Sequence, residues 1–215
     1  MKPEQKALLA VSMLSFAACA AAPTEQARAT PAPSASVSQL STSFSDTKWA
    51  RFRSKRFELS IAFPEGKSWR IDDHGSPWLT ARHPATGTLV RARIWHEASI
   101  VNGSACERRA REWLKDMPDV SNMEVIDERH IANVPAGGYD TVLRAGIVST
   151  KNTTANAPIS SVVLAFGASM KKCFAAVFQS EAAGIGASAQ SGDRLAFGTR
   201  IIESAVHQSD LEQPG

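Results

Sequence analysis

The chain has 215 residues, of which 43% are hydrophobic and 21% are charged, and its formal net charge at pH 7 is +3. This composition supports a buried core and argues against a wholly disordered chain. The nearly balanced charge lacks the basic surplus typical of nucleic-acid-binding proteins, so we expect no nucleic-acid partner.

The first 18 residues have the pattern of an export signal. Lys2 and Lys6 precede a short apolar run that ends at Ala18, and a basic region followed by a hydrophobic one is typical of a secretory signal peptide. A helix that spans a bilayer needs about 20 apolar residues. The run is too short for a stable anchor, so residues 1–18 are predicted to be a signal peptide.

Residues 16–19, Phe-Ala-Ala-Cys, resemble the bacterial lipobox, although lipoproteins most often have leucine at the position of Phe16. The resemblance implies that Cys19 receives diacylglycerol and becomes the acylated, palmitate-bearing N-terminus. The mature chain would then be anchored to a membrane facing the periplasm, the outer membrane in preference to the inner, or to the cell exterior. The alternative is ordinary cleavage at an Ala-x-Ala site, after Ala20 or Ala22, without a lipid.

A low-complexity segment follows the cysteine. Residues 20–48 contain Ala, Thr, Ser, Gln and three prolines, with almost no large apolar side chain before Phe44. Such a segment cannot bury enough surface to offset the entropy lost on ordering. We therefore predict a disordered tether through residue 48, a single α/β domain at residues 49–208, and a disordered tail at 209–215.

The first part of the domain has strand patterns. Residues 57–63 alternate large apolar side chains with polar or small ones, as in a half-buried strand, and a Pro-Glu-Gly turn ends the pattern. Residues 68–72 form a short second strand. Residues 78–83 and 88–96 are predicted to pair as an antiparallel hairpin across the turn at 84–87, with His83 opposite Thr88.

The periodicity then changes to that of an amphipathic helix. Asn102 or Ser104 can cap its start, and Pro118 closes it. Apolar side chains recur every three or four residues along one stripe, which is predicted to face the sheet: Cys106, Ala110, Trp113, Leu114 and Met117.

Four strands and a second helix complete the domain. Strands near 123–134 and 139–149 meet at a Pro-Ala-Gly-Gly turn. After a polar loop, the runs at 159–170 and 173–179 are apolar on both faces, which is typical of central strands. The helix at 187–206 is predicted to bury one apolar set: Leu195, Phe197, Ile201, Ile202 and Ala205.

These elements predict an α+β fold in which two helices sandwich one mainly antiparallel sheet. The order of elements, together with the Phe-x-Leu-x-Ile-x-Phe-Pro-x-Gly opening at 57–66 and the following Trp69, resembles the PsbP-like α/β/α sandwich. The resemblance spans roughly residues 52–206. Members of that family are mostly binding or accessory proteins, including bacterial periplasmic lipoproteins, which implies a non-enzymatic role here.

The number of cysteines is consistent with an exported lipoprotein. Lipidation of Cys19 would leave Cys106 and Cys173 as an even pair, able to form a disulfide in an oxidising compartment. The bond requires that the first helix cover the strand face carrying Cys173, Ala175 and Val177. The alternative is that the two cysteines are separate buried apolar side chains.

Catalytic and cofactor motifs are not evident. The glycine pattern at 184–189 has the local form of a dinucleotide loop, but too little chain follows it for the next parallel strand, so we interpret it as a connector. The Asp-Asp-His run at 72–74, with His83, His96 or His130, lacks the close ligand spacing of a zinc site and is typical of a turn. Cys106 lies on a buried stripe and is a poor nucleophile. No cofactor or metal is predicted.

One surface is a candidate for binding. The predicted hairpin register places two tryptophans and three arginines on one sheet face: Trp78, Arg82, Arg91, Arg93 and Trp95. Arginine and tryptophan are enriched in binding hot spots and suit an anionic or carbohydrate ligand, or a protein partner. The alternative is a solvated edge hairpin whose aromatic stems pack against neighbouring side chains.

We therefore expect a lipid-anchored periplasmic binding or accessory protein that is not an enzyme. Its partners would be the membrane, through the lipid, and an envelope protein or a small anionic ligand. The alternative is a hydrolase or a metal-dependent envelope enzyme whose site is assembled from distant residues.

Overall fold

The computed structural model describes residues 48–149 and 158–207. The predicted signal peptide, Cys19, the tether and the tail at 209–215 lie outside the described residues, as does the polar loop at 151–157. Within the described part the fold is α+β, with two α-helices and antiparallel strand pairing throughout both sheets, as predicted. No helix of the described residues is both long and apolar enough to cross a membrane.

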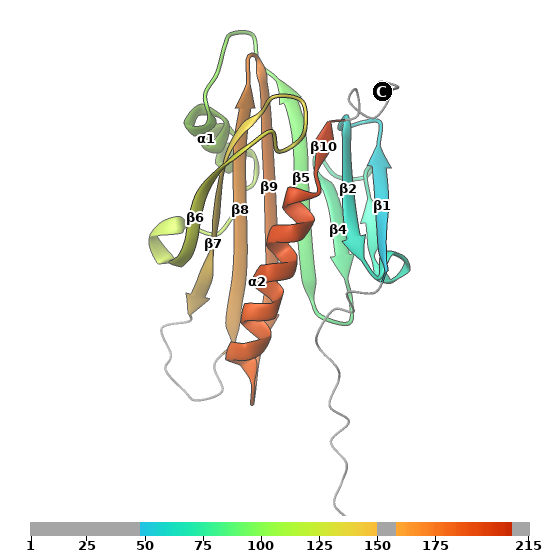
Figure 1. The fold of residues 1–215 in the computed structure, drawn as a ribbon, viewed down its shortest axis with the longest axis vertical. Helices are drawn as coiled ribbons and strands as arrows, with labels where there is room; N and C mark the ends of the chain where they lie inside the picture. Colours follow the sequence, from blue (N-terminus) through green and yellow to red (C-terminus); the bar gives the residue numbers. More distant parts are fainter. Residues whose placement is uncertain (1–47, 150–157, 208–215) are drawn as a thin grey trace, which may run out of the picture. The chain divides into compact units, whose positions relative to one another are not determined.

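The larger sheet has seven strands in the order β3-β4-β5-β9-β8-β7-β6 (Figure 1). Its strands run as predicted to within a few residues: β3 (Arg70–Asp72), β4 (Leu79–His83), β5 (Thr88–His96), β6 (Glu124–Ala132), β7 (Asp140–Ser149), β8 (Ile159–Ser169) and β9 (Lys172–Ala182). β8 and β9 are buried along most of their length because both sheet faces are covered. This confirms that the two apolar runs are central strands.

A second, three-stranded sheet was not predicted. It has the order β1-β2-β10, with β1 (Trp49–Ser54), β2 (Leu59–Pro64) and β10 (Val206–His207). The predicted strand at 57–63 belongs to it and starts later, because Glu58 has a φ of 51° and completes the turn after β1. β2 is buried at every residue rather than on one face. Because the described strands form two sheets, the prediction of a single sheet was wrong.

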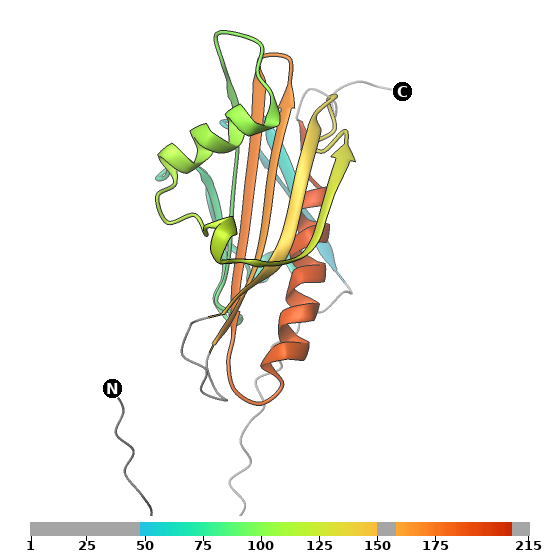
Figure 2. The same ribbon diagram turned by 90° about the vertical axis from the view of Figure 1, so that its left-hand side faces the viewer.

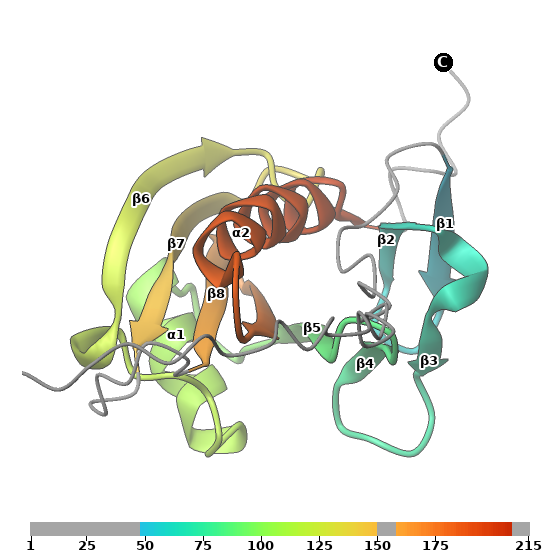
Figure 3. The same ribbon diagram turned by 90° about the horizontal axis from the view of Figure 1, so that it is seen from below.

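The two helices lie on opposite faces of the larger sheet, as Figure 3 shows. α1 (Gly103–Trp113) covers one face, and α2 (Ala187–Glu203) covers the other together with the small sheet. α2 ends before residue 206, where a helix end was predicted, because the chain turns at Ser204 into β10 and pairs with β2. Two 3-10 turns, η1 (Gly66–Ser68) and η2 (Val120–Asn122), connect elements.

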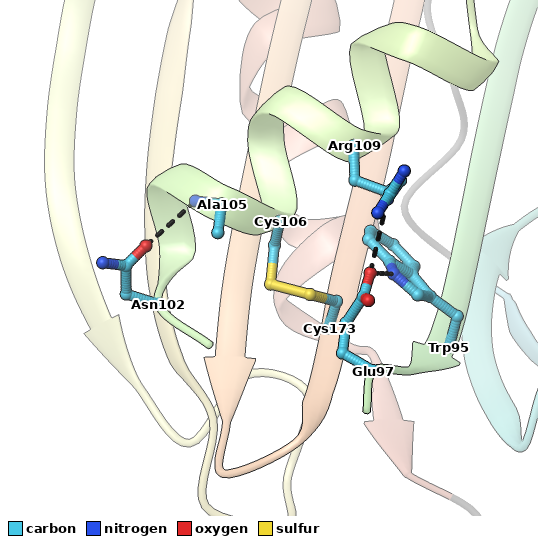
Figure 4. Close-up of a disulfide and its surroundings, with 7 residues drawn as sticks. All are labelled: Trp95, Glu97, Asn102, Ala105, Cys106, Arg109 and Cys173. Atoms are coloured by element: carbon cyan, nitrogen blue, oxygen red, sulfur yellow. Dashed lines mark hydrogen bonds and ion pairs between the residues drawn. A yellow bond between two sulfur atoms is a disulfide. The ribbon is translucent and has the colours of Figure 1, made fainter. Parts of the chain in front are cut away.

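α1 is capped and linked to the sheet near its N-terminal end. Asn102 caps its start by accepting a hydrogen bond from the backbone N–H of Ala105 at 2.9 Å (Figure 4). One turn later Cys106 forms a disulfide with Cys173 of β9, with 5.4 Å between the Cα atoms. The face of β9 that carries Cys173, Ala175 and Val177 is the one that α1 covers, as predicted.

The C-terminal end of α1 departs from the predicted stripe. Cys106, Ala110, Leu114 and Met117 are buried, but Trp113 is 40% exposed. The helix ends at Trp113, and the chain after it leaves the helical path (Figure 2). The indole of Trp113 packs edge-on against that of Trp95, with 5.1 Å between the ring centroids. This exposed tryptophan borders a cleft at the edge of the larger sheet.

Candidate binding cleft beside helix α1

The hairpin of β4 and β5 has the predicted register. His83 pairs with Thr88, Thr80 with Arg91, and Arg82 with Leu89. Side chains of directly paired residues share a sheet face. The predicted surface therefore lies on the face that α1 covers, where α1 leaves the edge of the sheet open.

The five predicted patch residues do not form one surface. Trp78 is only 2% exposed, and Trp95 is also buried, because both pack into the core beneath α1. The indole Nε1 of Trp95 donates to Glu97 Oε1 at 2.9 Å, as Figure 4 shows. Arg93 places its guanidinium 4.4 Å from the ring centroid of Trp113, and burial lowers the pKa of Arg93. Arg93 and Trp95 are thus engaged in packing.

The other three, Trp78, Arg82 and Arg91, line a cleft of about 450 Å³. This volume is within the range of small-molecule sites in proteins. The cleft lies where the edge of the sheet meets the end of α1, and β3, the loop after it, β4, β5 and α1 all contribute to its lining: Arg70, Ile71, Asp72, Ser76, Pro77, Trp78, Thr80, Arg82, Arg91, Trp113 and Leu114.

Arg91 is already neutralised within the protein. Its two terminal nitrogens donate to the two carboxylate oxygens of Asp116, each at 2.7 Å. This bidentate contact with the guanidinium lowers the pKa of Asp116. The pair shows that one carboxylate neutralises the charge of one arginine at this site.

Unlike Arg91, Arg70 and Arg82 do not pair with a carboxylate among the described residues. They are directly paired across β3 and β4, so their side chains leave the same face from opposite positions. Within the described residues neither has an ion pair or a direct hydrogen bond, although the field of Arg82 also contributes to the lowered pKa of Asp116. Like charges directly opposite each other on neighbouring strands are destabilising. The cleft thus holds two adjacent guanidiniums without a direct counter-ion.

Trp78, one of the lining residues, carries a buried donor without a partner within the described chain. Its indole Nε1 is buried and has no hydrogen-bond partner in the part of the chain that is described. Leaving a buried donor unpaired costs about 1–3 kcal/mol. The backbone groups of Trp78 do have hydrogen-bond partners: its N–H donates to Ser76 Oγ, and its carbonyl accepts from Thr80 Oγ1.

Sequence reasoning missed three residues of this site. Arg70 was assigned to a short strand, but the register of that strand against β4, which brings it opposite Arg82, could not be inferred. Trp113 was assigned to the buried stripe. Asp116 follows α1 and reaches Arg91 only through the tertiary fold.

Among the described residues, the other candidates from the sequence have structural roles. Asp72 Oδ1 accepts the backbone N–H groups of His74 and Gly75 at 2.9 and 2.8 Å, which makes a turn and lowers the pKa of Asp72. Within the described residues no three His, Cys, Asp or Glu side chains are grouped to hold a metal ion. The glycine pattern at 184–189 leads into α2, with Gly184 and Gly186 at positive φ.

One buried row of polar side chains in contact with one another resembles a catalytic arrangement. His83 Nε2 lies 3.5 Å from Glu65 Oε2, and His83 Nδ1 lies 2.9 Å from Thr86 Oγ1. The Thr86 hydroxyl continues to Thr88 Oγ1 at 2.7 Å. His83, Thr86 and Thr88 are all buried, so the hydroxyl that would act as a nucleophile is turned into the protein rather than toward a substrate.

No protein-family model matches the sequence, and no curated protein matches it either. Among solved structures, a Bacteroides thetaiotaomicron protein aligns with 76% of this chain at 12% identity and a TM-score of 0.41. This chain covers 50% of that protein's length. LpqN of Mycobacterium tuberculosis, described as involved in cell envelope biogenesis, aligns with 74% of this chain and 90% of its own at 12% identity and a TM-score of 0.39.

Proposed function

We propose that this protein is a non-enzymatic binding protein of the bacterial cell envelope. A lipid on Cys19 would hold it to a membrane facing the periplasm, and the cleft beside α1 would hold a small anionic ligand. The observation that carries the binding proposal is the pair Arg70 and Arg82, which face one cleft without a direct counter-ion among the described residues. The membrane anchor rests on the Phe-Ala-Ala-Cys sequence and the tether that follows it.

The chemistry of the cleft favours binding over catalysis. Its arginines are permanently charged donors and cannot exchange protons near neutral pH. Asp116, which pairs with Arg91 beside the cleft, has a lowered pKa and therefore stays ionised rather than acting as a general acid. The hydroxyls of Ser76 and Thr80 bond to the backbone of Trp78, and the lining residues include no histidine to activate them.

The test is to identify what the cleft retains in the native host. The full-length tagged protein would be extracted from envelope in mild detergent, and co-purifying small molecules and lipids would be measured by mass spectrometry. The matched variant is Thr80→Phe, because Thr80 is half-buried among the cleft residues and a larger side chain there fills the space. We expect at least one anionic species to be enriched with the wild type and lost with the variant.

The control is Arg53→Gln, which removes an exposed arginine from β1, outside the cleft. It should retain the same species as the wild type. Identical profiles for the wild type and a folded Thr80→Phe protein would contradict a binding role for the cleft.

A further inference from the structure

The geometry of the cleft specifies more than a general preference for anions. Arg70 and Arg82 are register partners on β3 and β4, so their Cβ atoms lie about 5 Å apart, as in any directly paired antiparallel residues. Two extended guanidiniums from these positions can reach one small ligand group. Each guanidinium offers its donors in a planar fork that matches oxyanions.

The charge of the arginine pair distinguishes the kinds of oxyanion. At Arg91 the single charge of one guanidinium is matched by the single charge of the Asp116 carboxylate. Arg70 and Arg82 together carry two unit charges, of which the single negative charge of a carboxylate would neutralise only one. A phosphoryl group has three terminal oxygens and more negative charge, so it can accept from both forks at once.

Two other features of the lining fit a ligand larger than the anion itself. The cleft volume of about 450 Å³ exceeds what one phosphoryl group fills. The half-exposed indole of Trp113 borders the remaining space, and the indole of Trp78, whose N–H is buried, lies beside it. An indole combines an apolar surface with one polar donor. The body of the ligand would contact these rings.

We propose that the cleft binds a phosphomonoester, with Arg70 and Arg82 holding its phosphoryl group. This inference rests on the proposed binding function and names the chemical class of its ligand. Such a group is available from a soluble metabolite or from a lipid headgroup, and the two sources share the chemistry that these arginines recognise.

The experiment uses the full-length protein purified in detergent and measures binding by calorimetry. The probes are glycerol 3-phosphate, glycerate and glycerol, which share a scaffold and carry a phosphomonoester, a carboxylate or neither. We expect glycerol 3-phosphate to bind and glycerate to bind at least tenfold more weakly. Arg70→Gln and Arg82→Gln should each weaken phosphate binding about 10- to 100-fold, as expected for loss of a charged hydrogen-bond partner.

Arg53→Gln is again the matched control and should bind as the wild type does. Thermal melts test folding independently, because removing one member of a like-charged pair should leave the melting temperature of Arg82→Gln unchanged or raised. Added glycerol 3-phosphate should raise the melting temperature of the wild type more than that of Arg82→Gln. Equal binding of glycerate and glycerol 3-phosphate would overturn the assignment to a phosphoryl group.

A second arm identifies the source of the group. The protein would be mixed with phosphatidylcholine vesicles with and without phosphatidic acid, whose headgroup is a phosphomonoester. Binding that requires phosphatidic acid and Arg82, without binding of glycerol 3-phosphate, would assign the site to a lipid. Binding of neither probe, while Thr80→Phe still loses a co-purifying species, would overturn the phosphoryl inference and leave the binding function standing.

Discussion

Burial of His83 makes the stability of the domain depend on pH. The side chain is only 3% exposed, and its ring lies against Trp69 with 5.2 Å between the centroids. Burial lowers the pKa of His83, with the nearby Glu65 carboxylate opposing the effect. The neutral form is therefore the one that the folded state prefers.

Acidification should for this reason destabilise the protein. A histidine has an ordinary pKa of about 6.5 when unfolded, so the contribution of neutral His83 is fully present above that pH. It is lost as the pH falls toward the lower folded value, by at most about 1.4 kcal/mol per pH unit. Denaturant unfolding at pH 7.5 and pH 5 should show a larger loss of stability for the wild type than for His83→Gln. Equal losses would contradict this.

At the cleft, single residues were predictable only through local register. The turn at 84–87 set the pairing of His83 with Thr88, and this was enough to place Arg82 and Arg91 on one face. Burial was not predictable in the same way, because α1 covers Trp78 and Trp95 through contacts distant in sequence. The partner of Arg91, Asp116, is separated from it by 25 residues and depends on where α1 ends.

Helix α2 contains two glycines that differ in the space around them. A Cβ built at Gly198 would lie 2.6 Å from Phe178 Cδ1 and 2.7 Å from Cγ, on the buried strand β9. A Cβ at Gly192, in the same helix, would meet nothing within 4 Å. Gly198 thus permits the close approach of α2 to the sheet, whereas Gly192 only lowers helix propensity.

The two alanine substitutions should therefore have opposite signs. Gly198→Ala should lower the free energy of unfolding by about 1–3 kcal/mol, because the buried ring and backbone must shift. Gly192→Ala should raise it by about 0.5–1 kcal/mol through better helix propensity. Chemical denaturation of both variants provides the measurement, each serving as the control for the other. A stabilised Gly198→Ala protein would show that α2 is less closely packed than described.

The disulfide should be the strongest single constraint on α1. It links residues 67 positions apart, and closing a loop of that length is worth about 4 kcal/mol in the chain-entropy model. The Cys106→Ala/Cys173→Ala protein should therefore unfold at a distinctly lower denaturant concentration than the oxidised wild type. Reduction of the wild type should reproduce the loss, and reduction of the double variant should change nothing. Two titratable thiols at Cys106 and Cys173 in the oxidised chain would rule out the bond.

Elements with a strong local pattern were predictable, and elements defined by distant pairing were not. The three- and four-residue spacing before Trp113 and the alternation in β9 correctly placed Cys106 and Cys173 on facing surfaces. β10 has two residues and pairs with β2 across most of the chain, so no local signal marks it. β1 is mostly exposed and carries two arginines, which hides its strand pattern.

At the scale of the whole molecule, the two faces of the larger sheet have different partners. One face carries the disulfide-linked α1 and the open cleft, and the other packs against α2 and the small sheet. β10 connects the small sheet to the larger one, since it pairs with β2 and bridges to Ala136 in the turn between β6 and β7. None of the residues that line the cleft belongs to β1, β2 or β10. Variants of the cleft can therefore be separated experimentally from variants that disturb the small sheet.

The proposed lipid on Cys19 would determine the fraction of the cell in which this domain is found. If Cys19 carries a diacylglycerol, two acyl chains are attached at once, and two chains suffice for stable anchoring where a single chain is marginal. Cys19→Ala should then move the protein from the membrane fraction to the soluble periplasmic fraction. Its melting temperature should equal that of the wild type, because residue 19 lies outside the domain predicted at 49–208.

The control is the Cys106→Ala/Cys173→Ala protein, in which Cys19 is the sole remaining cysteine. It should remain in the membrane fraction despite its lower stability, because the anchor does not depend on the disulfide. Mass spectrometry of the wild-type N-terminus should find a lipid mass on Cys19. An unmodified N-terminus at Ala21 or Pro23 would instead establish ordinary signal cleavage, and a Cys19→Ala protein that stayed with the membrane would require another means of attachment.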